Sequence, residues 1–270
     1  DMVCEKNSDV QHDFENDPID IYIEDNWLKA KGTTLGSDNG IGIAAALAVL
    51  ASDNVEHGPI ECLFTVDEET GLTGAAALGP NALKGSVLLN LDSEDDGEIF
   101  IGCAGGIDTV ATLSYTPAMA PKNYFWATIT VKGLKGGHSG DDIEKGLGNA
   151  TALLNRFLWQ QYSKTDLRLA CFDGGNLRNA IAREAHALIG IPFDQKEQLR
   201  IDFNHYITDV EGELLLKEPD IRLELESESA PATVVDKKTA DALFNALYAC
   251  PHGPLRMSDE LPGLVETSTN

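Results

Sequence analysis

The hydrophobic pattern of this sequence changes once, near residue 106, and this change most limits what the chain can fold into. Before it, short apolar runs at 60–66 and 86–91 alternate with predicted helices at 40–50 and 71–83. Strands that alternate with helices predict an α/β domain with a mostly parallel sheet. The helix at 40–50 is apolar on nearly every side, which predicts that it is buried against that sheet.

Beyond a glycine-rich junction at 102–106, the predicted elements follow the order strand, helix, strand, strand, helix, strand. That order is the split pattern of ferredoxin-like α+β domains. The strands are predicted at 124–131, 167–172, 185–193 and 221–226, and the helices at 146–160, 195–217 and, with Asp236 as N-cap, 237–249. We therefore expect two domains, at 1–106 and 107–270.

The composition excludes several classes of protein. The formal net charge is −24, from 44 acidic and 20 basic residues, and such a surface repels nucleic acids and anionic membranes. The sequence has no run of eighteen apolar residues, so it predicts no transmembrane helix. The five cysteines are far apart and form no CxxC pair, which argues against a disulfide framework and predicts buried, reduced thiols.

Carboxylates gather at three places in the first half, each beside a predicted helix or strand. Asp38 precedes the first helix, Glu68 and Glu69 end the first strand, and Asp92 follows the second. Asp38 is equally compatible with a helix N-cap, and the glutamate pair with a solvated loop. Clustered like charges at the end of a sheet cost free energy unless cations compensate them. We therefore expect a metal site with oxygen ligands, and loop caps are the alternative.

Several motifs in a fixed order carry a more specific likeness. They are TLGSDNGIG at 34–42, DEETG at 67–71 and GLKGGHSG at 133–140, with shorter matches at 92–94, 102–106, 175–180 and 265–268. Together they resemble the M20 metallopeptidases, and in particular the aminoacyl-histidine dipeptidases, also called cytosolic non-specific dipeptidases or bacterial carnosinases. The resemblance implies a zinc-peptidase-like catalytic domain, partial in this chain, and a ferredoxin-like lid that also mediates dimers.

The resemblance also implies a pair of zinc ions, with manganese or cobalt as substitutes, and assigns their ligands. Asp38 would bridge the two ions, Glu69 would bind one, and Asp92 would bind the other. A hydroxide between the ions would attack the peptide, because adjacent dications lower the pKa of bound water. The resemblance also assigns Glu68 as the general base. Its role can differ from that of Glu69, because the side chains of successive residues point in different directions.

Asp1 matches the aspartate that, in these dipeptidases, orients a ligand histidine through a hydrogen bond. That histidine would precede Asp1, and a second ligand histidine would follow the last residue. We therefore expect this chain to be an internal fragment that lacks both ligand histidines and is inactive by itself.

In the second domain, the resemblance assigns His138 to stabilisation of the tetrahedral oxyanion and to substrate binding, and Asn179 to contact with the substrate. A lone histidine is more often structural, but the glycines around His138 allow a backbone to approach a ligand closely. Preorganised donors of this kind contribute about 3 kcal/mol to transition-state stabilisation.

The expected activity is metal-dependent hydrolysis of dipeptides, of the Xaa-His type, by a cytoplasmic homodimer. Small peptides are then the partners, and nucleic acids and membranes are not. The alternatives are a tripeptidase or amino-acid deacylase of the same superfamily, a non-catalytic lid or oligomerisation module, and an acidic scaffold whose carboxylates only cap loops.

Overall fold

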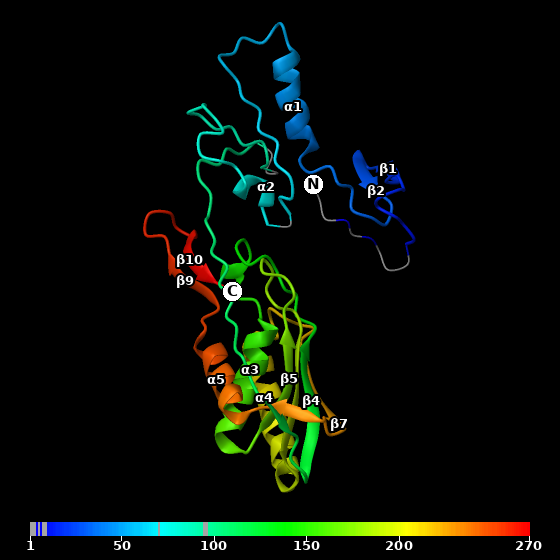
Figure 1. The fold of residues 1–270 in the computed structure, drawn as a ribbon, viewed down its shortest axis with the longest axis vertical. Helices are drawn as coiled ribbons and strands as arrows, with labels where there is room; N and C mark the ends of the chain where they lie inside the picture. The colour runs from blue at the N-terminus through cyan, green and yellow to red at the C-terminus, as the bar shows by residue number, and fades with distance from the viewer. Residues whose placement is uncertain (1–3, 5, 7–9, 70, 94–96) are drawn as a thin grey trace. The chain divides into compact units, whose positions relative to one another are not determined.

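The computed structural model describes residues 4, 6, 10–69, 71–93 and 97–270. The chain divides into two compact units, which we call unit 1 (residues 1–105) and unit 2 (residues 106–270). Each unit is described by itself. In Figure 1, unit 1 runs from blue to green-cyan and unit 2 from green to red.

Unit 1 contains a hairpin and two helices among its described residues. Strands β1 (Ile21–Glu24) and β2 (Trp27–Ala30) pair in antiparallel register. The two residues between them, Asp25 and Asn26, have φ values of 48° and 70°, as a two-residue type I′ turn requires. The helices are α1 (Gly40–Ala51) and α2 (Thr73–Ala76).

Several expectations for unit 1 are wrong. The segments 60–66 and 86–91 do not form strands, and the described part of this unit contains no parallel strand pair. A strand needs neighbours that accept and donate its backbone hydrogen bonds. Without a sheet beside it, helix α1 has its predicted span but only Gly42 is buried. Helix α2 is shorter than the predicted 71–83 and ends before Gly79 and Pro80, a pair that helical geometry disfavours.

Unit 2 confirms the predicted order of elements. Its four-stranded sheet has the strand order β5-β6-β4-β7, and all three pairings are antiparallel. The elements in chain order are β4 (Tyr124–Lys132), α3 (Ala150–Lys164), β5 (Arg168–Gly174), β6 (Ala185–Pro192), α4 (Lys196–Leu214) and β7 (Arg222–Glu228). The order of strands in the sheet is that of a split βαββαβ unit.

Unit 2 contains further elements outside this sheet. Helix α5 (Lys237–Ala249) has Asp236 as N-cap, as predicted, because the Asp236 carboxylate accepts the N–H of Thr239 at 3.0 Å. Helix α3 starts later than the predicted 146, because its N-cap is Asn149. The remaining elements are β3 (Pro117–Met119), the 3-10 helices η1 (Ile143–Lys145) and η2 (Phe193–Gln195), β8 (Thr233–Val235), α5 (Lys237–Ala249), β9 (Gly253–Met257) and β10 (Val265–Thr269).

The hydrophobic core lies in unit 2. Alternate residues of β4 point toward the helices, among them the buried Ile129 and Val131. They pack with Leu154 and Phe157 of α3 and with Phe244 of α5. Burying one such side chain contributes roughly 1.5–3 kcal/mol, so this cluster holds the helices on the sheet that Figure 1 shows.

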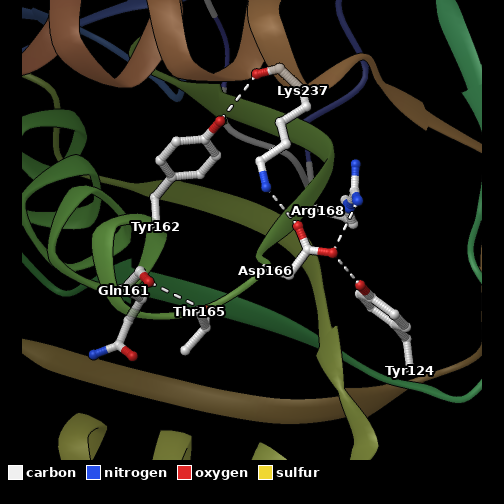
Figure 2. Close-up of polar contacts among 7 residues, drawn as sticks. All are labelled: Tyr124, Gln161, Tyr162, Thr165, Asp166, Arg168 and Lys237. Carbon is white, nitrogen blue, oxygen red and sulfur yellow. Dashed lines mark hydrogen bonds and ion pairs between the residues drawn. The ribbon is translucent and has the colours of Figure 1, made fainter.

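A polar cluster joins α5 to the sheet (Figure 2). The Asp166 carboxylate accepts from Lys237 Nζ at 2.7 Å, from Tyr124 Oη at 2.6 Å and from Arg168 at 2.9 Å. The Tyr162 hydroxyl donates to the carbonyl of Lys237 at 3.0 Å. The hydrogen bond from Lys237, followed by that from Tyr124, holds the pKa of Asp166 well below its usual range. The start of α5 is therefore fixed by charge as well as by packing.

The expectations about membrane-spanning helices and about the cysteines can be compared with the structure. Among the described residues, the helices are all too short or too polar to cross a membrane. All five cysteines are free thiols, but burial was predicted wrongly, because Cys62 is half-buried and the others are exposed, namely Cys4, Cys103, Cys171 and Cys250.

Candidate functional site

The first site motif surrounds the start of helix α1. The N-cap is Asn39, whose side-chain oxygen accepts the N–H of Gly42 at 2.8 Å. The alternative role for Asp38, a helix cap, is therefore wrong, because the next residue fills that position. A Cβ at Gly42 would lie 2.6 Å from the Asn39 amide nitrogen, so a larger residue there would displace the capping side chain.

Asn39 also links two segments that are distant in sequence. Its amide nitrogen donates to the carbonyl oxygen of Leu91 at 2.6 Å. Asp38 and Asp92 are the immediate neighbours of these two residues. One side chain thus brings the first and third acidic motifs together.

The middle acidic motif is a tight turn. The Thr73 hydroxyl donates to the Asp67 carboxylate at 2.9 Å, and the N–H of Gly74 donates to the carbonyl of Val66 at 3.1 Å. A Cβ at Gly74 would lie 2.6 Å from that carbonyl oxygen, so only glycine fits. Asp67 thus takes part in closing the turn that presents Glu68.

Electrostatics shows that the motifs share one environment. The pKa of Glu68 is raised, first by desolvation and then by the negative charges of Glu69, Asp92 and Asp38. Across the described ranges, however, no three His, Cys, Asp or Glu side chains reach metal-binding spacing. The structure brings the three predicted ligands near Glu68 without forming a closed ligand shell. Asp1 lies outside the described residues.

The donor set of this carboxylate cluster suits a divalent cation. Carboxylate oxygens bind magnesium, manganese and zinc, and several like charges held close together are stabilised by a cation. The Glu68 pKa is raised first by desolvation and then by the charges of Glu69, Asp92 and Asp38, and this gathering of negative charge is the observation that fits a cation here. If a metal binds, Asp38, Glu69 and Asp92 are the described residues that would hold it.

Unit 2 has a candidate site of its own, which contains His138. An isolated antiparallel bridge pairs His138 with Ala180. The N–H of Ser139 donates to the carbonyl of Asn179 at 2.9 Å, and the N–H of Ile181 donates to the carbonyl of Gly137 at 2.9 Å. The two residues predicted in this domain, His138 and Asn179, therefore lie on adjacent segments.

Glycines make the turn before His138 possible. Gly136 has φ +68°, and a Cβ there would lie 2.4 Å from the Arg183 side chain. Gly137 has φ +159°, and a Cβ there would lie 2.8 Å from the Cβ of Asp142. The His138 side chain is 50% exposed, so the turn presents it outward.

Two acidic residues that support this loop were missed in the sequence. Asp142 accepts the N–H of His138 at 2.7 Å, and its position four residues after the histidine was the available signal. Glu218 is fully buried and accepts the N–H groups of Lys135 at 2.8 Å and Gly148 at 2.9 Å. No local pattern marks Glu218, because its partners are about 70 and 80 residues away in sequence.

Two relatives match this chain, one over its whole length and one over part of it. It is 48% identical over 270 residues to the cytosol non-specific dipeptidase of Escherichia coli (strain K12), covering 100% of this chain and 56% of that protein. It is 32% identical over 174 residues to the uncharacterized protein YqjE of Bacillus subtilis (strain 168), covering 62% of this chain and 42% of that protein.

A solved structure and a family model agree with these relatives. The aminoacylhistidine dipeptidase of Vibrio alginolyticus superposes with a TM-score of 0.75 at 48% identity, covering 99% of this chain and 55% of that one. The chain thus spans about half the length of the dipeptidases that it matches. The model of peptidase family M20/M25/M40, which implies a divalent metal, matches residues 4–264. The chain therefore belongs to peptidase family M20/M25/M40.

Proposed function

We propose that the protein hydrolyses dipeptides, including those with a C-terminal histidine, and that it uses a pair of zinc ions to do so. The similarity to the dipeptidases of Escherichia coli and Vibrio alginolyticus, at 48% identity in both cases, supports this reaction and substrate class. The observation that carries the proposal is the hydrogen bond from Asn39 to the carbonyl of Leu91, because it links the segments that contain Asp38 and Asp92.

In this proposal, three carboxylates of unit 1 hold the metal. Asp38 would be a ligand of both ions, Glu69 of one and Asp92 of the other. Bound zinc supplies Lewis acidity, polarising a carbonyl and lowering the pKa of water. Manganese or cobalt can take the place of zinc, because oxygen-rich sites accept all three. Asp1 belongs to the same proposal as the residue that orients a ligand histidine.

The remaining residues move protons or hold the substrate. Glu68 takes the proton from the attacking water and returns it to the leaving amine. The raised pKa of Glu68 suits a group that must both accept and release a proton. His138 donates a hydrogen bond to the tetrahedral oxyanion, and Asn179 contacts the substrate; the backbone ladder between their segments supports a joint role.

The metal assignment is tested by measuring metal content and hydrolysis in the intact protein and its Asp92→Asn variant. The variant should lose bound metal and activity together, and an exposed Asp53→Asn variant should lose neither. Chelation should abolish activity, and zinc should restore it. Full metal content and full activity in Asp92→Asn would contradict the ligand assignment.

The substrate class is tested separately with dipeptides, tripeptides and N-acylated amino acids. Dipeptides with a C-terminal histidine should be hydrolysed, and blocked or longer substrates should not. Preference for a tripeptide or an acylated amino acid would replace the dipeptidase assignment by one of the other activities of the superfamily.

The proposal also includes a cytoplasmic homodimer in which unit 2 is the lid and dimerisation domain. The name of the Escherichia coli relative, a cytosol dipeptidase, supports the location. The ferredoxin-like order of the sheet in unit 2 supports a separately folded lid. Sedimentation of the protein should give a dimer, and a monomer with full activity would remove the dimer from the proposal.

A further inference from the structure

The ring of His138 is held by the backbone of its own loop. Its Nδ1 lies 3.1 Å from the amide nitrogens of both Gly140 and Asp141, and both N–H groups donate to it. In a neutral imidazole, one nitrogen carries the hydrogen and the other accepts. Because Nδ1 accepts, the hydrogen is on Nε2.

Asp142 closes this loop from the other side. Its carboxylate accepts the N–H of His138 at 2.7 Å, and its own N–H donates to the carbonyl of His138 at 3.2 Å. The other carboxylate oxygen pairs with the Lys145 ammonium. The bond to Lys145, then that from His138, lowers the pKa of Asp142, so the carboxylate stays ionised and accepts only.

The loop leaves little room for another arrangement. A Cβ at Gly137 would lie 2.8 Å from the Cβ of Asp142, so the aspartate packs directly on the glycine. Ile143, the next residue, is 2% exposed and anchors the turn in the core. Asp142 is therefore fixed between a glycine and a buried isoleucine.

We propose that Asp142 is a positioning residue for His138: it fixes the loop whose Gly140 and Asp141 N–H groups hold the ring as the Nε2–H tautomer. The ring then presents a hydrogen-bond donor to the oxyanion. The identity of that acceptor rests on the proposed hydrolase function, whereas the tautomer rests on the loop geometry alone. The Asp141 carboxylate lies 3.5 Å from Nδ1, but a hydrogen on Nδ1 would break both backbone bonds.

Nitrogen NMR of the ¹⁵N-histidine-labelled protein measures the tautomer directly. The His138 signals are assigned by their loss in a His138→Gln variant, at a pH well above the ordinary titration range of imidazole. The expected result is a single tautomer with its hydrogen on Nε2. A hydrogen on Nδ1, or the tautomer mixture of an unconstrained side chain, overturns the inference.

Two variants of Asp142 test its positioning role. Asp142→Ala should turn the single tautomer into a mixture. Asp142→Asn should keep it, because the amide oxygen still accepts the His138 N–H, but should shift that amide proton as the acceptor loses its charge. Asp141→Asn is the matched control, since the Asp141 side chain is 91% exposed, and should leave the tautomer unchanged.

Folding is monitored in the same spectra by the signals of His186 and His205, which lie on β6 and α4. If Asp142→Ala unfolds unit 2, the amide shift in Asp142→Asn decides the role of the carboxylate. A single tautomer that survives in a folded Asp142→Ala, or an unshifted amide proton in Asp142→Asn, overturns the positioning role.

Kinetics then separate this inference from the proposed function. In the intact protein, Asp142→Ala should lower kcat about tenfold and change KM little, as expected for a residue that orients a functional histidine. If dipeptide hydrolysis is absent but the Nε2–H tautomer is found, only the proposed function fails. If hydrolysis is present and kcat of Asp142→Ala is unchanged, the inference fails.

Discussion

Replacing Glu218 with glutamine tests whether one buried carboxylate fixes both ends of the His138 loop. Its two oxygens accept the N–H groups of Lys135 and Gly148, which precede and follow that loop. The residue is 0% exposed, so water cannot replace either bond. Glutamine has the same shape but only one accepting oxygen.

The expected loss can be worked out from these two bonds. In the variant, one of the two N–H groups donates to a neutral amide oxygen in place of a charged carboxylate oxygen, which lowers the free energy of unfolding by about 1 kcal/mol. The other faces the amide NH₂ and is left without an acceptor, which costs roughly 1–3 kcal/mol. Burying a neutral side chain is easier than burying a charge, which offsets part of the loss. The net destabilisation of Glu218→Gln should be about 2 kcal/mol.

Urea unfolding followed by tryptophan fluorescence measures this loss, because Trp126 is 3% exposed in the sheet of unit 2. The control is Glu211→Gln, which makes the same chemical change at an exposed position of α4. A loss for Glu218→Gln below about 0.5 kcal/mol, or an equal loss in the control, would refute the reasoning that both bonds are made to a charged acceptor.

Three further outcomes concern unit 2. Asp166→Asn should lower the free energy of unfolding by about 1 kcal/mol, since water screens its partly exposed ion pairs. The pKa of Asp166 in the folded protein lies below the ordinary 3.8, so this stabilisation is present above about pH 4 and is lost as the pH falls. Wild type and variant should therefore converge in acid unfolding curves. Burial lowers the pKa of His252 from 6.5, so stability should fall as the pH drops below that value, and thermal melts of His252→Gln should lack this step. Phe244→Ala should cost roughly 3–5 kcal/mol in urea unfolding, because the ring is 0% exposed, and a loss under about 1 kcal/mol would contradict its place in the core.

Unit 2 was predictable because its signals are local. The strand at 124–131 and the helix at 237–249 each pack one face against a core made within the same segment of chain. Periodicity reports such faces directly. The pair of β3 with β8 was missed, since these strands have only three residues each and pair across more than 100 residues of sequence.

Unit 1 was less predictable, because a buried parallel strand depends on neighbours that the sequence pattern does not name. The runs at 60–66 and 86–91 have the composition of such strands yet lie unpaired. In the site, the acidic motifs at Asp38 and Asp92 were recognisable, but the link between them was not. That link is made by an asparagine amide and a backbone carbonyl, and a carbonyl carries no sequence signature.

The double role of Asn39 makes the acidic motifs sensitive to chemical ageing. Its oxygen caps α1 and its nitrogen holds the carbonyl of Leu91, so both ends of one amide are in use. Asparagine followed by glycine, as at Asn39–Gly40, is the dipeptide in which the amide is lost most readily. Deamidation of Asn39 to aspartate would keep the accepting oxygen of the cap but replace the donating NH₂ by an oxygen that faces the Leu91 carbonyl, and this repulsion would separate the segments of Asp38 and Asp92 without altering either aspartate.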